Sequence, residues 1–164
     1  MQTAPPDITY SAKARNFTNL RARVGYFVPA LERAIAQQPD KQKFDLHLKE
    51  EEHFEDTYVD IDKKMYAVTD VVIYVVGGIV ELRRVRIVDD KDVAVRPRSK
   101  ADNAAKYLFS VIVADVFEVS GNFDVNNLRR TAQSFAEIYT ITAIRKTVFA
   151  EHTSQWESSE ESLY

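Results

Sequence analysis

An aspartate and a glutamate flank a predicted β-hairpin, and these residue types could support catalysis. Asp70 is followed by an apolar strand and a turn, and then by Glu81-Leu82-Arg83. Two carboxylates across a hairpin can hold a divalent cation, and a neighbouring lysine can orient water, which would be the chemistry of a nuclease. Arg83 stands where that lysine would be, and a guanidinium is a poor proton carrier because it stays charged. Outward-facing charges on a two-faced hairpin are therefore the favoured interpretation.

The three histidines do not form a recognisable metal-binding motif. His47 and His53 are six residues apart with Glu50–Glu52 between them, and His152 lies far away in the sequence. Histidines exposed at a strand end and in a loop are the simpler interpretation of this spacing. Gly77-Gly78 has no neighbouring lysine or helix start, so it does not resemble a phosphate-binding loop. The sequence therefore predicts no cofactor and no metal.

Composition predicts a globular domain without a membrane span. The chain has 164 residues, of which 45% are hydrophobic and 29% charged, and its formal net charge is −3. The longest apolar runs fall short of the roughly 18 residues that a spanning helix needs. The sequence contains no cysteine, which fits a reducing cytosol. We expect a cytoplasmic domain over residues 1–154 and a flexible acidic tail over residues 155–164.

Charged residues are unevenly distributed along the chain. A basic stripe consists of Arg83, Arg84, Arg86, Arg96, Arg98 and Lys100. No aromatic residues are interleaved with this stripe, so no nucleic-acid partner is expected. An acidic segment precedes the hairpin and could bind a basic partner protein. The partner-docking candidates in this segment are Glu50, Glu51, Glu52, Glu55 and Asp56.

Hydrophobic periodicity predicts several strands in the first half of the chain. Lys43–Lys49 alternates between apolar and polar residues, as a half-exposed strand does, and Thr57–Ile61 is a short strand or its continuation. Met65–Val76 and Ile79–Val88 are rich in β-branched residues and flank Gly77-Gly78, which predicts a hairpin with a two-residue turn. Val93–Asn103 reads as a loop.

Three segments have patterns that permit more than one secondary structure. Ser11–Gln38 carries apolar residues at helical spacing, but a strand followed by a short helix beginning at Pro29 also fits. Tyr107–Val119 is apolar and rich in β-branched residues, which favours a buried strand, and Gly121-Asn122 then lets the chain reverse. A helix follows from Asp124, and Ile138–Val148 is a second helix or a strand.

The segment Tyr107–His152 resembles the C-terminal half of the SecB export-chaperone family. In that family a long last strand ends in a Phe-x-Ile-x-Gly-like turn, which Phe117, Val119 and Gly121 match here. Ala143 and Arg145 lie near the position of the family's Pro-Tyr-Ala-Arg element. The resemblance implies an α+β fold: an antiparallel sheet of about four strands with two C-terminal helices packed on it and an N-terminal helix or strand.

The resemblance also implies a function that needs no catalysis. SecB-like proteins assemble as dimers of dimers and hold unfolded or pre-secretory polypeptides in apolar grooves without nucleotide. The expected partners are unfolded client proteins, together with a translocase motor or, for a dedicated chaperone, an antitoxin. The apolar strands need cover on both faces, and the predicted helices cannot supply all of it. The apolar surface that stays uncovered would form the contacts of a homo-oligomer and such a groove. The candidate groove residues are Phe109, Phe117, Val119, Phe135, Tyr139 and Phe149.

Two alternative functions belong to other functional classes, a structural assembly protein and an enzyme. A structural subunit of an oligomeric assembly, such as a phage tail or neck component, would use the hairpin and helices to pack into a ring. The divalent-metal nuclease ranks third, since its motif is short and lacks the lysine.

Overall fold

A long hairpin is the centre of a seven-stranded antiparallel sheet in the computed structural model, which describes residues 8–14, 17–52, 54–138 and 144–147. Helices pack on this sheet, and two of them lie in the C-terminal half, which confirms the predicted α+β class. The strands are β1 (Thr9–Ala14), β2 (Phe17–Val24), β3 (Lys43–His47), β4 (Thr57–Ile61), β5 (Lys64–Val76), β6 (Ile79–Val88) and β7 (Ile144–Thr147). The helices are α1 (Phe27–Gln37), α2 (Lys100–Ser120) and α3 (Asn126–Ile138).

The hairpin forms as its sequence predicts. β5 and β6 pair in antiparallel register up to Val76 and Ile79, and the two glycines between them have φ angles of 59° and 79°. Such left-handed conformations suit glycine and match the twist of a tight hairpin. β6 occupies one edge of β5, while β4 and β3 pair successively along the other edge. The sheet then continues through β2, β1 and β7.

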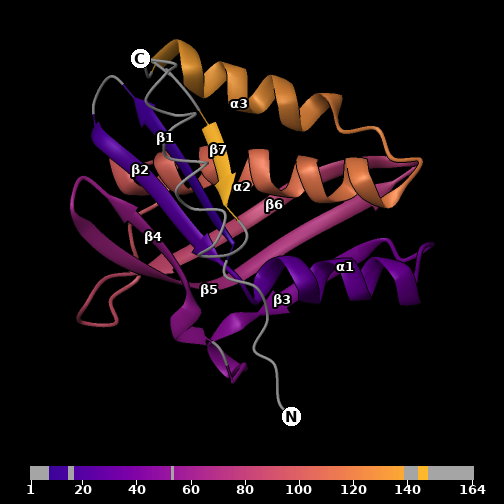
Figure 1. The fold of residues 1–164 in the computed structure, drawn as a ribbon, viewed down its shortest axis with the longest axis horizontal. Helices are drawn as coiled ribbons and strands as arrows, with labels where there is room; N and C mark the ends of the chain where they lie inside the picture. The colour runs from indigo at the N-terminus through magenta and orange to yellow at the C-terminus, as the bar shows by residue number, and fades with distance from the viewer. Residues whose placement is uncertain (1–7, 15–16, 53, 139–143, 148–164) are drawn as a thin grey trace.

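The helix α2 covers the inner face of this sheet (Figure 1). It contacts β1, β2, β4 and β6, and α1 and α3 flank it. Its residues Leu108, Phe109, Ile112 and Val113 are buried on several sides of the helix, which is typical of a core helix. None of the helices in the described ranges is both long enough and apolar enough to cross a membrane.

The strand predicted for Tyr107–Val119 is wrong, because this segment lies within α2. Its β-branched residues favour a strand only weakly, and burial against the sheet overrides that preference. Ser99 supplies the helix start, since its hydroxyl accepts a hydrogen bond from the Asp102 amide at 3.2 Å. Gly121 does end the element, with a φ of 143°, but it ends a helix. The motif that resembled a SecB strand therefore lies at a helix C-terminus.

The segment Ser11–Gln38 is not one helix either. β1 and β2 pair as a hairpin, and α1 follows with Pro29 in its first turn, close to the alternative of a strand and then a helix. Leu20 and Val24 suggested helical spacing, yet they share one face of β2 because residues four apart also match in a strand. Ile138 ends α3 and Ile144–Thr147 forms β7, whereas residues 139–143 and the predicted tail lie outside the described residues.

Within the described residues, the outer face of the sheet carries charged side chains, and none of the three helices packs on it. Arg21 lies 3.4 Å from Asp60, joining β2 and β4. His47 on β3 donates a hydrogen bond to Asp70 on β5 at 2.8 Å, and this bond, aided by the negative charge of Asp45, raises the pKa of the imidazole. The surplus apolar surface expected for a client groove is therefore not on this face of the described strands.

The core contains a hydroxyl whose removal should stabilise the protein. Tyr107 is 1% exposed, and its hydroxyl has no hydrogen-bond partner among the described residues; burial raises the pKa of this phenol, which keeps it protonated. Because an unpaired buried polar group costs about 1 kcal/mol or more, Tyr107→Phe should raise the free energy of unfolding by about 1 kcal/mol. Urea denaturation measures this change.

The partly exposed Tyr74 provides the matched control, because it lies on the outer face. Tyr74→Phe should change the free energy of unfolding by less than about 0.5 kcal/mol. A loss of stability in Tyr107→Phe would show that the buried hydroxyl is paired in solution.

Candidate functional site

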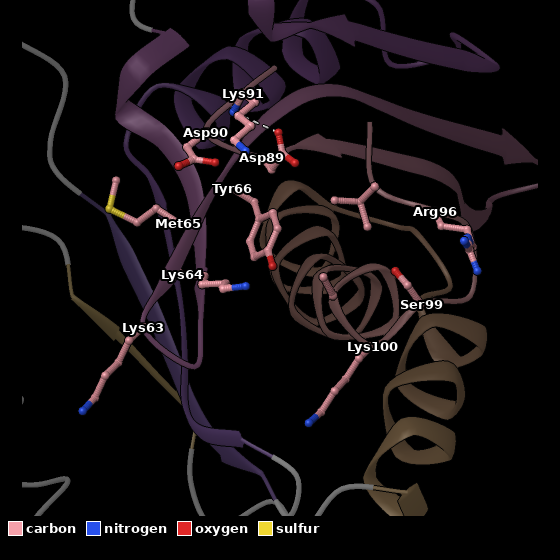
Figure 2. Close-up of a pocket in the computed structure, with 12 residues that line it drawn as sticks. Lys63, Lys64, Met65, Tyr66, Asp89, Asp90, Lys91, Arg96, Ser99 and Lys100 are labelled. Carbon is pink, nitrogen blue, oxygen red and sulfur yellow. Dashed lines mark hydrogen bonds between the residues drawn. The ribbon is translucent and has the colours of Figure 1, made fainter. Parts of the chain in front are cut away.

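A cavity of about 910 Å³ lies where the β4–β5 turn, the loop after β6 and the start of α2 meet. Figure 2 shows Lys64, Tyr66 and Lys100 extending into the opening between β5 and α2, whereas the Lys63 and Arg96 side chains at its rim extend away from it. We call this the basic cavity. Its lining residues are Lys63, Lys64, Met65, Tyr66, Asp89, Asp90, Lys91, Val95, Arg96, Ser99, Lys100 and Ala101.

Positive charge dominates the lining of the basic cavity. Five of its residues are cationic and two are acidic, although the whole chain carries a net charge of −3. One of the two carboxylates, Asp89, accepts hydrogen bonds at 2.9 Å from the backbone amides of Lys91 and Val93. This carboxylate therefore stabilises the loop that follows β6. The cavity therefore presents an excess of positive charge to any molecule that enters it.

Most of the cationic side chains lack a neutralising partner. No carboxylate in the described ranges forms an ion pair with Lys63, Lys64, Lys91 or Arg96. Like charges held in one cavity repel each other, and this repulsion raises the free energy of the empty cavity. A bound anion would offset it.

The amino-terminal end of α2 adds to the positive potential. Ser99, Lys100 and Ala101 line the basic cavity as the N-cap and first two residues of this 21-residue helix. The amide groups of a first helical turn have no partners within the helix, and the helix dipole places partial positive charge there. The buried carboxylate of Asp102 accepts the Arg98 amide at 2.9 Å and thereby fixes the loop against the helix start.

Backbone strain is concentrated in the loops around the basic cavity. Four non-glycine residues of the described chain have positive φ angles, namely Asp62 (53°), Lys63 (70°), Asp92 (62°) and Arg98 (64°). Each is a lining residue or lies next to one in the sequence. Left-handed conformations cost side-chain-bearing residues free energy, and such strain gathers at ligand-binding sites. Aspartate tolerates this conformation better than most residues, so the steric cost falls mainly on Lys63 and Arg98.

Sequence analysis found only part of this site. Arg96 and Lys100 belong to the predicted basic stripe, but Arg83, Arg84 and Arg86 lie on β6 outside the basic cavity. Lys63 and Lys64 were missed because their turn precedes the stripe by most of the β5–β6 hairpin. Lys91 was missed because it lies among Asp89, Asp90 and Asp92, although it is within the span of the stripe. The repeated pattern of an aspartate followed by lysine in those turns, Asp62-Lys63-Lys64 and Asp90-Lys91, was the available signal.

Among the predicted groove residues, the three whose side chains the structure describes do not form one surface. Phe109 and Phe117 have no exposed surface and pack in the core, whereas Val119 is 78% exposed at the end of α2. Phe135 is part of α3, and Tyr139 and Phe149 lie outside the described residues. In place of lining a groove, Phe109 packs edge-on against Phe27, with ring centroids 5.2 Å apart.

The acidic docking candidates are partly engaged within the chain. Glu51 accepts a hydrogen bond from the Tyr26 hydroxyl at 3.1 Å, and Asp56 lies 4.0 Å from Arg23. The remaining three, Glu50, Glu52 and Glu55, are exposed.

The carboxylates of the nuclease hypothesis are not brought together. Asp70 lies opposite Arg86 in the hairpin, whereas Glu81 lies opposite Tyr74. Four residues of β5 separate these positions, which corresponds to about 13 Å along a strand. Glu81 instead lies 3.3 Å from Arg83. The structure therefore gives no support to a cation held between Asp70 and Glu81.

Comparisons with protein-family models, with curated proteins and with solved structures found no match to this chain.

The strained turn at Lys63 yields a prediction that separates stability from ligand binding. Lys63→Gly should raise the free energy of unfolding by about 1 kcal/mol, because glycine adopts a φ of 70° without the steric cost that lysine carries. The same substitution removes one cation from the basic cavity and should weaken anion binding. Thermal unfolding measures the first effect and calorimetric titration with inorganic pyrophosphate the second.

A suitable control is Lys41→Gly, which lies in an exposed loop and has no positive φ. This control should not raise stability. Equal or lower stability of Lys63→Gly relative to the unmodified protein would contradict the proposed strain.

Proposed function

We propose that this protein binds a small phosphate-bearing anion in the basic cavity at the start of α2. The observation that carries the proposal is the set of four cationic side chains, Lys63, Lys64, Lys91 and Arg96, that surround one cavity and form no ion pair with any described residue. Phosphate oxygens accept hydrogen bonds from lysine, arginine and helix amide groups, and all three kinds of donor line this cavity.

The size of the cavity supports a ligand larger than inorganic phosphate. Small-molecule sites usually span about 300 to 1,000 Å³, and 910 Å³ lies near the upper end of that range. The lining also includes Met65, Tyr66 and Val95, which offer apolar contact beside the charges. An anion whose phosphate group is attached to an organic moiety would use both kinds of surface.

The positions of the cations support binding by enclosure. Lys63 and Lys64 come from the β4–β5 turn, Lys91 and Arg96 come from the loop after β6, and the amide groups come from α2. These three segments surround the opening in Figure 2. A ligand bound there would contact all three, so its binding should order the loops as well as neutralise charge.

The SecB-like chaperone stays a prediction of the sequence, as do the oligomer and the client proteins. Phe109 and Phe117 are buried and the outer face carries ion pairs, so the described residues offer this hypothesis little support. The basic cavity is a better-defined feature, and a binding domain is therefore the function that the geometry supports best.

The proposal predicts measurable binding of inorganic pyrophosphate. Isothermal titration calorimetry should detect one site per chain, and Lys64→Gln should weaken the affinity about tenfold, which equals about 1.4 kcal/mol. The double variant Lys64→Gln/Lys91→Gln should lose more, because each substitution removes a separate donor. Affinity should also fall as sodium chloride is raised, since the interaction is between charges.

The control variant is Arg130→Gln. Arg130 is an exposed arginine on α3 that does not line the basic cavity, so the substitution removes the same charge from elsewhere on the molecule. It should leave the affinity within about twofold of the unmodified protein. Equal losses in Arg130→Gln and Lys64→Gln, or no binding of pyrophosphate by the unmodified protein, would contradict the proposal.

A further inference from the structure

A second cluster of ligand-type side chains lies on the outer face of the sheet, away from the basic cavity. Asp45 and His47 are two residues apart on β3 and therefore point to the same face. Asp70 lies directly opposite His47 on β5. One ligand atom from each of these three residues lies within 4.8 Å of the others.

The two contacts of the His47 ring differ in kind. The Nδ1 atom lies 2.8 Å from Oδ1 of Asp70 and donates a hydrogen bond to it. The Nε2 atom lies 3.3 Å from Oδ1 of Asp45, but the two atoms do not meet the geometry of a hydrogen bond. The Asp45 oxygen is shielded from solvent and accepts no hydrogen bond from any described residue. It is thus a lone acceptor beside the accessible ring nitrogen.

The spacing of these two atoms fits a metal ion between them. Two ligand atoms about 2.0 to 2.1 Å from a tetrahedral zinc ion lie about 3.3 to 3.4 Å apart. The observed separation of the Asp45 oxygen and the His47 nitrogen is 3.3 Å. The Lys43 ammonium lies 3.9 Å from Oδ2 of Asp45, so it does not occupy the space between Oδ1 of Asp45 and Nε2 of His47.

Asp70 supplies the supporting contact that zinc-binding histidines usually have. A carboxylate that accepts the Nδ1 hydrogen fixes the ring orientation and leaves Nε2 as the ligand atom. The Thr69 hydroxyl lies 3.2 Å from the other oxygen of Asp70 and 3.2 Å from the Arg86 carbonyl oxygen, and its single proton is shared between these two acceptors. β5 pairs with β3, β4 and β6, whereas β3 pairs with β5 alone among the described strands, so the cluster spans an edge strand and the strand beside it.

We propose that Asp45 and His47 bind a zinc ion through Oδ1 and Nε2, with Asp70 as a positioning residue. The ligand class is a borderline-soft divalent cation, because an imidazole and a carboxylate suit zinc, whereas magnesium and calcium require a shell of oxygen atoms. The remaining coordination positions of the ion face solvent, since the His47 side chain is 52% exposed.

Calorimetric titration of the full chain with zinc chloride tests this site. His47→Ala and Asp45→Asn should each abolish the high-affinity event. Asp70→Asn should weaken it by about 10- to 100-fold, as loss of a supporting carboxylate does. Magnesium chloride should produce no binding at these residues. The ¹⁵N resonance of His47 Nε2 should shift on zinc addition, which reports ligation at that atom directly.

His53→Ala is the matched control, because it removes another of the three histidines in the sequence and the proposal assigns that histidine no role. It should leave zinc affinity unchanged. Unaltered zinc binding by His47→Ala would overturn the proposal, and so would the absence of binding to the unmodified protein at about 1 mM zinc, the weak limit of a specific site. Either result would leave the cluster as a histidine that bridges two carboxylates. Circular dichroism of each variant confirms that it folds.

Discussion

The packing of α2 against the inner face of the sheet is the interaction on which the other features depend. Buried residues on several sides of the helix contact strands from β1 to β6, and edge-on aromatic pairs join Phe109 to Phe27 and Phe117 to Phe44 and Phe123. Burial of large aromatic side chains is among the strongest contributions to a core. Since this packing fixes the helix axis, it also fixes where the first turn of α2 lies. That turn forms one wall of the basic cavity.

The distribution of charge follows from the same architecture. With the helices on the inner face, the outer face of the sheet meets solvent, and its charges are arranged in pairs across neighbouring strands, such as Arg21 with Asp60. Exposed pairs of this kind contribute little to stability, but they give the face a polar character that is unsuited to an apolar client. The basic cavity lacks such pairing for Lys63, Lys64, Lys91 and Arg96 within the described chain. Together with the positive φ angles in its loops, this lack of pairing supports the proposed anion site.

Local sequence patterns predicted the elements that are stabilised by residues close in sequence. They failed for the elements whose secondary structure depends on tertiary packing. The β5–β6 hairpin could be predicted because two glycines at a tight turn and two β-branched strands agree with each other. The core helix could not, since Val111, Ile112 and Val113 favour a strand until the rest of the sheet buries them. β2 was left undecided between strand and helix because its inward residues are also compatible with helical spacing. The basic cavity was missed because its cations come from three separate segments that only the fold brings together.

The central claim is that the basic cavity is where an anion binds, and nuclear magnetic resonance tests it most directly. The ¹H–¹⁵N spectrum should be recorded during addition of inorganic phosphate at constant ionic strength. The account predicts saturable shifts for the amides of Lys63, Lys64, Lys91 and Ala101, with α3 and the outer face of the sheet unaffected. Shifts spread evenly over all basic surface residues, or no shifts at the start of α2, would contradict it.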